Sequence, residues 1–585
     1  MRKTKIICTL GPATDNDEIL KALILNGMSV ARVNMSHGVH ADHKVRIDKV
    51  KKMREQLNIP VGILLDTRGP EIRTGTFPNK TEELVTGQQF TLTTNKVEGT
   101  NEICSITYAD LYKDVESGSR ILIDDGLIEM KVLRIDNKDI ICEVLNGGTV
   151  SSYKGINVPG VRLSLPFISE QDKLDIAFGV EQDVDFIASS FTRNGHDILQ
   201  LRAELEKLNS NDIRIVAKIE NAEGVNNIDE IIRVSDGIMV ARGDLGVEIP
   251  LEEIPIIQKK LISKAYSAGK QVITATQMLD SMMKNPRPTR AESTDVANAI
   301  YDGTSAIMLS GETAAGKFPV NAVKTMALIA ERTEEDINYK SRFAKRDIKE
   351  RQDVTSAISH ATCTTAHDLG AVAILAVSKT GQTARMLSKF RPAYPIICGT
   401  TNKKVQRQMA LSWGVIPILI DEKNNTDELF EHVVSVAENC KLVNNGDLVV
   451  ITAGIPLGVS GTTNMLKVHL VGDVLLSGTV VNHNSVYGRL CVCENEEEAW
   501  ENFKDGDILV IPSTSNDILP LMRKANGIIT ETGGVTSHAA VVSLALDIPV
   551  IVNAKNAVKL LKSGTTVKLD GNRGIVFSAN SNLHI

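Results

Sequence analysis

The chain has 585 residues, of which 42% are hydrophobic and 23% are charged, and its formal net charge at pH 7 is -7. This composition is ordinary for a soluble protein, and the net charge gives no reason to expect nucleic acid or an anionic membrane as a partner. A chain of this length is too long for one core and predicts about three to four domains.

The N-terminus and the cysteines bear on the compartment. The start, MRKTKIICTLGP, has basic residues but only a short apolar run, whereas a secretory signal needs a longer apolar core and a small-residue cleavage site. No apolar run is long enough to span a membrane. The eight cysteines are scattered, with only Cys491 and Cys493 close together, which favours free thiols in a reducing compartment. We therefore expect a cytoplasmic protein without a membrane segment.

Short apolar or β-branched runs, each ending in polar residues and followed by a helix-patterned segment, recur along the N-terminal part of the chain. Strands that alternate with helices form parallel sheets, and eight such units predict a closed (β/α)8 TIM barrel, which we place at residues 1–70 and 166–345. The chemistry of such barrels lies at the carboxyl ends of the strands. The runs are TKIICTLG, VARVNMSHG, VGILLDTRG, DFIASSFT, RIVAKIEN, GIMVARGD, QVITATQM and SAIMLSGE.

Three further segments have different patterns. Between the third and fourth runs, β-like pieces such as QFTLTT and DIICEVL predict an all-β domain inserted at residues 71–165, which can close over the barrel mouth as a lid. After the charged connector RFAKRDIKERQD, strands and helices alternate again and predict a smaller α/β domain at residues 346–473. Residues 474–585 form a fourth unit with a motif of its own.

The fifth and sixth runs carry one lysine and two carboxylates. Lys218 and Glu220 alternate along a strand and so point the same way, and Asp244 ends the next strand. Two carboxylates at neighbouring strand ends suit Mg²⁺ or Mn²⁺, and a lysine beside them stabilises negative charge that develops in a transition state. The alternative interpretation is a structural Lys–Glu ion pair.

A second cluster follows the second and third strands. Asn34, Ser36, Asp66 and Thr67 offer oxygen atoms without excess charge, as a monovalent cation requires. Arg32 and Arg73 are permanent cations with the planar fork that holds phosphate. The alternative for the two arginines is a solvated surface pair.

The stretch GETAAGKF, Gly311 to Phe318, comes within one residue of the nucleotide-binding loop G-x-x-x-x-G-K-[ST]. The final hydroxyl of that loop holds Mg²⁺, and Phe318 stands in its place. This stretch alone therefore leaves open whether it is an altered nucleotide loop, a coincidence or part of a different phosphate site.

Taken together, the motifs resemble those of the pyruvate kinase family, in order, over roughly residues 1 to 470. The resemblance makes GETAAGKF the loop after the eighth strand and excludes the nucleotide-loop interpretation. Met35 and Arg68 replace a more usual Phe and Lys without putting the activity in doubt. The matching stretches are TKIICTLGPAT, ARVNMSHG, LLDTRGPEIRTG, GINVPGVRLSLP, KIENAEG, MVARGDLGVE, ITATQMLDSM and PTRAESTDVANAIYDGTSAIMLSGETAAGKFP.

This resemblance implies an activity and a set of site residues. The activity is transfer of the phosphoryl group of phosphoenolpyruvate to ADP, giving pyruvate and ATP in the last step of glycolysis, by a homotetramer with Mg²⁺ (or Mn²⁺) and K⁺. Glu71 occupies a position that is acidic in K⁺-dependent members, so we expect dependence on K⁺. The implied residues are Lys218, Arg32, Arg73 and Thr276 for catalysis; Arg32, Gly243, Asp244 and Thr276 for phosphoenolpyruvate; Asn34, His37, Arg73 and Lys154 for the nucleotide; Glu220 and Asp244 for Mg²⁺; and Asn34, Ser36, Asp66 and Thr67 for K⁺.

The α/β domain contains an anion-site pattern. In AVSKTGQTARMLSKFRP, backbone N–H groups and hydroxyls lie between a strand and a helix, an arrangement that binds anions. In the family this loop binds a phosphorylated allosteric activator, whose identity stays open among fructose bisphosphate, ribose phosphate and AMP. An ordinary capped helix is the alternative. The loop residues are Ser378, Lys379, Thr380, Gly381, Gln382 and Thr383.

The fourth unit contains TETGGVTSHAAVVSLALDIPVIVNA, which resembles the swivelling phosphohistidine domain of phosphoenolpyruvate-utilising synthases and dikinases. His538 matches the histidine that those enzymes phosphorylate. Either His538 carries a phosphoryl group, or the unit is a retained appendage that affects stability or regulation; we favour the appendage because no ATP-grasp segment accompanies it. A dikinase-like enzyme and a metabolite-sensing barrel without activity remain as alternative functions.

Overall fold

The computed structural model describes most of the chain. Some positions named in the sequence analysis lie outside the described residues. They are the predicted domain boundaries at residues 346 and 473, the chain ends at 1 and 585, and part of the charged connector. The described part forms two compact units, the first within residues 1–363, 376–421 and 453–464 and the second within 364–375, 422–452 and 465–585. The structure describes residues 2–345, 353–423, 425–455, 463–472 and 474–578.

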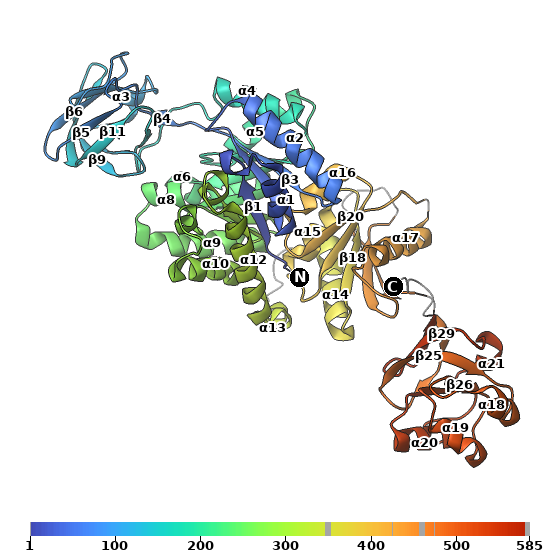
Figure 1. The fold of residues 1–585 in the computed structure, drawn as a ribbon. Helices are drawn as coiled ribbons and strands as arrows, with labels where there is room; N and C mark the ends of the chain where they lie inside the picture. Colours follow the sequence, from blue (N-terminus) through green and yellow to red (C-terminus); the bar gives the residue numbers. More distant parts are fainter. Residues whose placement is uncertain (1, 346–352, 424, 456–462, 473, 579–585) are drawn as a thin grey trace. The chain divides into compact units, whose positions relative to one another are not determined.

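Eight parallel strands close into a barrel in the first unit, in the order β1-β17-β16-β15-β14-β13-β3-β2 (Figure 1). The barrel confirms the predicted fold, and each of the eight apolar runs overlaps one of its strands. The strands are β1 (Lys5–Thr9), β2 (Met28–Asn34), β3 (Gly62–Asp66), β13 (Phe186–Ser189), β14 (Arg214–Ile219), β15 (Gly237–Ala241), β16 (Gln271–Ala275) and β17 (Ala306–Leu309).

Helices alternate with these strands. Two of them begin with a reciprocal capping box, α4 at Ser169 and α10 at Thr289, which satisfies N–H groups that the first helical turn leaves free. The helices of this part are α1 (Asp17–Leu25), α2 (His40–Leu57), α4 (Glu170–Glu181), α5 (Gly195–Lys207), α6 (Ala222–Asn226), α7 (Ile228–Val234), α8 (Arg242–Glu248), α9 (Ile254–Ser267), α10 (Arg290–Asp302), α11 (Gly311–Ala314), α12 (Pro319–Asp336) and α13 (Tyr339–Ala344).

The interiors of the barrel strands are mostly apolar because both of their faces are buried. Alternate residues such as Val30, Phe186 and Ile273 form one core, while their neighbours pack into a second core with helix residues. Leu411, from a later segment of the first unit, also belongs to the first of these cores. Polar side chains are therefore confined to the ends of the strands, where the site lies.

A separate all-β segment interrupts the barrel between β3 and α4. It forms a seven-stranded sheet in the order β4-β12-β8-β9-β10-β6-β7 and a two-stranded sheet of β11 and β5, around its own core. Its elements are β4 (Ile72–Arg73), β5 (Thr81–Leu84), β6 (Gln89–Thr93), β7 (Ile103–Ser105), α3 (Leu111–Asp114), β8 (Arg120–Ile123), β9 (Ile128–Asp136), β10 (Asp139–Asn146), β11 (Gly148–Ser151) and β12 (Gly155–Asn157).

Strands and helices alternate again after the barrel, as predicted for an α/β segment, and β19 and β20 pair in parallel. Within the first unit, Arg407 of α16 donates to the buried carboxylate of Asp185 at 2.7 Å, at the amino end of β13. The elements are α14 (Val354–Leu369), β18 (Ala373–Val377), α15 (Gln382–Lys389), β19 (Ile396–Thr400), α16 (Lys403–Met409), β20 (Val415–Leu419), α17 (Thr426–Asn439), β21 (Leu448–Ala453) and β22 (Met465–Leu470).

The last segment, in the second unit, has an eight-stranded sheet in the order β23-β30-β29-β25-β26-β27-β28-β24. Strands β25 to β28 pair in parallel, whereas β29 pairs antiparallel with β25 and β30. The elements are β23 (Val474–Ser477), β24 (Thr479–Val480), β25 (Ser485–Val492), α18 (Glu496–Asn502), β26 (Ile508–Ile511), α19 (Leu519–Met522), β27 (Gly527–Thr530), α20 (His538–Leu546), β28 (Val550–Val552), α21 (Ala557–Leu560), β29 (Thr566–Asp570) and β30 (Ile575–Ser578).

One sequence expectation, the absence of a disulfide framework, is met at this level. None of the eight cysteines, all of which the structure describes, forms a disulfide, and the Sγ atoms of Cys491 and Cys493 lie 3.6 Å apart. Among the residues that the structure describes, no helix is both long enough and apolar enough to cross a membrane.

Candidate active site

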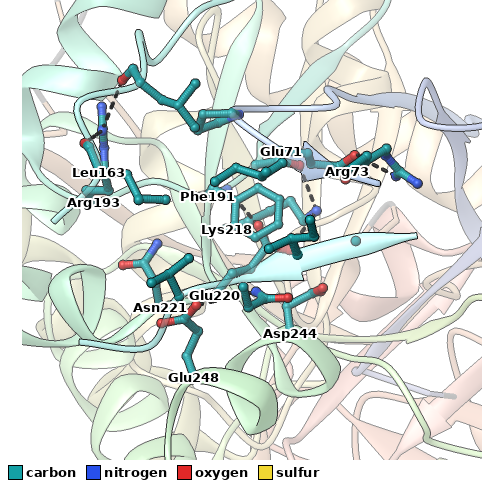
Figure 2. A pocket seen from close by; sticks show the side chains of 18 of the residues that line it. Glu71, Arg73, Leu163, Phe191, Arg193, Lys218, Glu220, Asn221, Asp244 and Glu248 are labelled. Carbon is teal, nitrogen blue, oxygen red and sulfur yellow. Dashed lines mark hydrogen bonds and ion pairs between the residues drawn. The ribbon is translucent and has the colours of Figure 1, made fainter. Parts of the chain in front are cut away.

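A cavity of about 870 Å³ opens at the carboxyl ends of the barrel strands (Figure 2). The barrel contributes Arg32, Lys218 and Glu220 to its wall, and the inserted β segment contributes Arg73 and Lys154. Residues from two distant parts of the sequence thus surround one space. Of the predicted site residues, the cavity is lined by Arg32, Asn34, Ser36, His37, Glu71, Arg73, Lys154, Lys218, Glu220 and Asp244.

The ammonium group of Lys218 is the central cation of the cavity. Its Nζ lies 2.7 Å from Ser190 Oγ, 2.8 Å from Glu220 Oε1 and 3.2 Å from Asp66 Oδ1. Burial opposes the charged form, but Asp66, Glu220 and Asp244 outweigh it and raise the pKa of Lys218. The lysine is therefore fully charged at neutral pH.

Asp66, at the end of β3, holds two cations in place. Its fully buried carboxylate accepts a hydrogen bond from Arg32 Nε at 2.6 Å and forms an ion pair with Lys218. Burial opposes ionisation, yet the charges of Arg32 and Lys218 outweigh it and lower the pKa of Asp66. Arg32 also donates to Thr9 Oγ1 at 3.0 Å, which fixes the guanidinium from a second strand. The arginine is buried, so the alternative of a solvated surface pair is wrong for Arg32.

Glu220 and Asp244 present carboxylates to the same cavity. Burial raises the pKa of Glu220 and the charge of Asp244 adds to this rise, although Lys218 opposes it. Within the described residues, Asp244 makes no hydrogen bond or ion pair through its carboxylate. Glu220 and Asp244 thus face the same cavity, and the Asp244 carboxylate has no partner there in the described chain. Such a pair of carboxylates fits a hard divalent cation, which completes its coordination shell with water and substrate oxygens. In the part of the chain that the structure describes, here or elsewhere, no group of three or more His, Cys, Asp or Glu side chains is arranged to hold a metal ion, so a cation on Glu220 and Asp244 would need oxygens from water and substrate.

The prediction for Asp244 needs one correction. The sequence pattern placed this residue at the end of a strand, but it lies in the first turn of α8, after β15 has ended at Ala241. The helix begins there because the backbone turns immediately at Arg242, whose guanidinium donates to the carbonyl oxygens of Ala275 and Thr276.

The residues predicted to hold a monovalent cation lie at the ends of the adjacent strands β2 and β3 or just after them. Asn34 and Asp66 are opposite each other in the register of β2 and β3, and Asn34 Oδ1 accepts the Ser36 N–H at 3.1 Å. Thr67 is buried, and its carbonyl oxygen accepts the Ser190 hydroxyl at 2.7 Å. The set consists of amide, hydroxyl, carbonyl and carboxylate oxygens, which fits a weakly charged cation such as K⁺ chemically.

Gly243 and Thr276, both predicted for the phosphoenolpyruvate site, do not line the cavity, but they contact each other. The Gly243 N–H donates to Thr276 Oγ1 at 2.8 Å. Thr276 has a φ of 68° and Gln277 one of 53°, a left-handed conformation that is costly for a β-branched residue. Such strain persists where surrounding contacts fix the backbone, here the Arg242 guanidinium that donates to the Thr276 carbonyl oxygen at 2.7 Å.

The four residues predicted for the nucleotide, namely Asn34, His37, Arg73 and Lys154, all line the cavity. Arg73 donates to Glu71 Oε2 at 2.8 Å and to the carbonyl oxygen of Tyr153 at 2.8 Å, and Lys154 pairs with Asp124 at 2.9 Å. These cations are partly exposed and held by acidic partners that an anionic ligand can displace. His37 lines the cavity and is exposed.

Four site residues were missed by the sequence reasoning. Ser190 contacts Lys218, the Phe191 N–H donates to Glu220 Oε2 at 2.6 Å, and Asn221 and Glu248 line the cavity. Ser190 directly follows β13, so the same strand-end criterion that selected Asp66 could have found it. Phe191 has a φ of 54°, and this backbone role leaves no signal in the sequence.

The GETAAGKF stretch has no free phosphate-binding loop. It forms the four-residue helix α11, and the carboxylate of Glu312 accepts the N–H groups of Ser310 at 2.7 Å and Leu279 at 3.1 Å. A carboxylate at the start of this helix occupies the place that a phosphate takes in a nucleotide loop.

The predicted effector loop lies between β18 and α15, away from the cavity residues. Gly381, with a φ of 74°, caps the amino end of α15, and a Cβ atom there would lie 2.6 Å from Met409. The Ser378 N–H donates to Gly399 O at 3.0 Å, and the Thr383 hydroxyl pairs with that of Thr463 at 2.8 Å. The loop is thus a defined strand-to-helix turn, which both the anion site and an ordinary capped helix require.

His538 starts helix α20 in the second unit. Its Nδ1 lies 2.8 Å from Thr514 Oγ1 and its Nε2 lies 3.0 Å from Asn516 Oδ1. Both ring nitrogens therefore have hydrogen-bond partners, which orient the imidazole at the amino end of the helix.

The closed barrel, with its charged cavity at the carboxyl ends of the strands, defines the chain as a (β/α)8-barrel enzyme. Family models match in three places: the pyruvate kinase barrel domain at residues 1–323, the pyruvate kinase alpha/beta domain at 356–469 and the mobile domain of PEP-utilising enzymes at 503–574. The chain belongs to the pyruvate kinase family, and it is a phosphotransferase.

Relatives match over the whole chain. The chain is 48% identical to a pyruvate kinase of Sporosarcina psychrophila and 50% identical to one of Bacillus licheniformis, in each case over 585 residues and 100% of both chains. A crystal structure of a pyruvate kinase from Cryptosporidium parvum matches 80% of this chain and 96% of its own, with a TM-score of 0.76 and 41% identity. Members of this family generally use Mg²⁺ and K⁺.

Proposed function

We propose that the chain transfers the phosphoryl group of phosphoenolpyruvate to ADP, giving pyruvate and ATP in the last step of glycolysis. The observation that carries this proposal is the position of the Lys218 ammonium, 2.8 Å from Glu220 in a cavity that Asp244 also lines. Phosphoryl transfer needs little covalent help but much alignment and charge neutralisation. The Lys218 ammonium lies beside two carboxylates that can hold a metal cation, and together the two positive charges can neutralise and align the phosphoryl group.

In this proposal the barrel residues bind and orient phosphoenolpyruvate. Arg32 and Lys218 contact the phosphoryl group, and Lys218 also stabilises the enolate oxygen that forms when the phosphoryl group leaves. Gly243 and Asp244 lie at the carboxylate end of the substrate. Thr276 lies near the carbon that gains a proton, and its hydroxyl accepts the Gly243 N–H at 2.8 Å.

Two cations complete the site in this proposal. Glu220 and Asp244 hold Mg²⁺ or Mn²⁺, which neutralises phosphoryl oxygens as a Lewis acid when bound. Asn34, Ser36, Asp66 and Thr67 hold K⁺. The nucleotide lies along Asn34, His37, Arg73 and Lys154, and the inserted β segment excludes water from the reaction as a lid.

A coupled assay with lactate dehydrogenase, run with and without each cation, tests the activity and both cation sites. We expect pyruvate formation only with Mg²⁺ or Mn²⁺ and a strong increase with K⁺. Glu71→Lys brings a fixed ammonium to the K⁺ side of the cavity and should make the activity independent of K⁺. Glu71→Gln, which also breaks the pair with Arg73 but adds no cation, should stay dependent on K⁺. Equal K⁺ responses of the two variants would contradict this assignment.

We also propose the regulation and assembly that the family resemblance implies. The loop of residues 378–383 binds a phosphorylated activator, the protein is a cytoplasmic homotetramer, and the domains are those at 1–70 with 166–345, 71–165, 346–473 and 474–585. Titration of the activity with fructose bisphosphate, ribose phosphate and AMP identifies the activator, and light scattering gives the oligomeric state. No response to any of these compounds would reject the effector loop.

The matched mobile domain supports a second candidate function for the last segment, in which His538 accepts a phosphoryl group. We favour an appendage that affects stability or regulation, because no ATP-grasp segment accompanies it in the sequence. Mass spectrometry after incubation with phosphoenolpyruvate, at a pH that preserves phosphohistidine, decides between the two. An unmodified His538 excludes the phosphoryl carrier, and a phosphorylated one excludes an appendage that takes no part in phosphoryl transfer.

A further inference from the structure

Among the described residues, Ser190 is the one uncharged side-chain partner of the Lys218 ammonium. It directly follows β13 and is buried, with 2% of its surface exposed. Lys218 Nζ donates to its Oγ at 2.7 Å. The same Oγ lies 2.7 Å from the Thr67 carbonyl oxygen and 3.1 Å from Asp66 Oδ1, so it has acceptors for its own proton. The hydroxyl therefore turns its lone pairs toward Lys218.

The other two partners of Lys218 have competing contacts. Glu220 Oε2 accepts the Phe191 N–H, and this residue faces the cavity as a proposed ligand of the divalent cation. Asp66 is shared with Arg32. An ammonium group has three N–H donors, and here Ser190, Glu220 and Asp66 take one each. Any contact between Lys218 and a substrate requires one of the three to give way, and Glu220 is the partner that a bound divalent cation would draw away. Ser190 has no role as a cation ligand and keeps its hydrogen bond to Lys218.

The backbone around Ser190 is built to hold it. Its N–H donates to Thr67 Oγ1 at 3.2 Å. Gly69, with a φ of 75°, packs so closely that a Cβ atom there would lie 2.9 Å from Ser190 Cβ and 3.0 Å from Ser190 O. The next residue, Phe191, has a φ of 54°. The left-handed backbone of Phe191 and the close packing of Gly69 both constrain Ser190, so the position of its hydroxyl relative to Lys218 is fixed.

We propose that Ser190 is a positioning residue for phosphoryl transfer: its hydroxyl directs the Lys218 ammonium so that one N–H points at the transferring group. This inference rests on the proposed role of Lys218. Since the hydroxyl is neutral, it fixes a direction without lowering the positive charge that the transition state needs. Ser190 acts through Lys218 and is expected to affect kcat more than the binding of substrate.

The test is Ser190→Ala in the full-length protein, with Ser189→Ala as matched control. Ser189 is the neighbouring serine and is equally buried, and in the described chain no hydrogen bond joins its hydroxyl to Lys218 or Asp66. We expect Ser190→Ala to lower kcat by roughly 10- to 100-fold, the range for loss of one hydrogen bond to a charged group, with little change in KM for phosphoenolpyruvate. Ser189→Ala should keep kcat near that of the wild type.

A double variant separates positioning from an independent role. In a Lys218→Met background, measured by single-turnover ATP formation at high enzyme concentration, Ser190→Ala should cost no further activity, because the group that it orients is absent. Gly69→Ala should also lower kcat, because it displaces Ser190 without removing a polar group. Thermal unfolding of each variant identifies loss of fold.

The outcomes are distinguishable. An unchanged kcat in folded Ser190→Ala, or the same loss with and without Lys218, would overturn the positioning role. Full activity in Lys218→Met would overturn the proposed function itself, and the inference with it. A loss confined to kcat that disappears in the Lys218→Met background supports it.

Discussion

Replacing Lys218 by methionine is the sharpest perturbation of the cavity, because it removes the ammonium and keeps a long unbranched side chain. The ammonium has three contacts, at 2.7 Å to Ser190, 2.8 Å to Glu220 and 3.2 Å to Asp66, and it is buried. A preorganised group of this kind, acting where negative charge develops, typically contributes about 100- to 1000-fold to kcat. We expect a loss of at least that size, with a smaller change in KM.

The assay is coupled pyruvate formation, with Mn²⁺ binding followed in parallel by electron paramagnetic resonance. Glu220 and Asp244 remain in the variant, so Mn²⁺ should still bind. Lys5→Met is the matched control: Lys5 lies at the amino end of β1, where its ammonium donates to Val415 O at 2.7 Å, and its loss should leave kcat nearly unchanged. A Lys218→Met enzyme with kcat within about threefold of the wild type would refute the reasoning.

Two predictions concern the stability of the barrel. Arg407→Met should lower the free energy of unfolding by about 3–5 kcal/mol, because the variant leaves the buried Asp185 carboxylate without the guanidinium donor that now lies at 2.7 Å. A melting temperature within a degree or so of the wild type would contradict this. Asp236 is ion-paired with Arg214 and Arg202; burial opposes ionisation, but these arginines and the Ile215 N–H outweigh it and lower the pKa of Asp236. Because the pKa of Asp236 is lower in the folded state, the ionised carboxylate stabilises the fold at pH values above its unfolded-state pKa of about 4, and this stabilisation is lost as the pH falls further. The melting temperatures of wild type and Asp236→Asn should therefore differ at pH 7 and converge in acid. A difference that stays constant with pH would argue against this.

The sequence predicts the barrel well because one physical requirement governs all eight strands. Residues such as Val30 and Ile273 are buried on one face and their neighbours on the other, so the interiors of the strands are mostly apolar. That same requirement confines charge to the strand ends and made Lys218, Glu220 and Asp66 recognisable as a group. The resemblance to a family supplied their roles, which strand patterns alone do not contain.

The pattern of apolar and polar residues does not predict the details of the site that depend on backbone conformation. The left-handed conformations of Thr276 and Phe191 leave no mark on residue choice, and Asp244 lies on a helix because the chain turns one residue after β15. Ion pairs between distant residues, such as Arg407 with Asp185, depend on how α16 packs at the amino end of β13. Such contacts follow from packing and become visible only in three dimensions.

Product analysis tests the central claim most directly, namely that phosphoryl transfer takes place at the barrel cavity and not through His538. Wild type and His538→Ala are incubated with phosphoenolpyruvate, ADP, Mg²⁺ and K⁺, and the products are followed by phosphorus NMR. We predict one ATP for each phosphoenolpyruvate consumed and equal rates for the two proteins. AMP, pyrophosphate or free phosphate as stoichiometric products, or loss of the activity in His538→Ala, would contradict the claim.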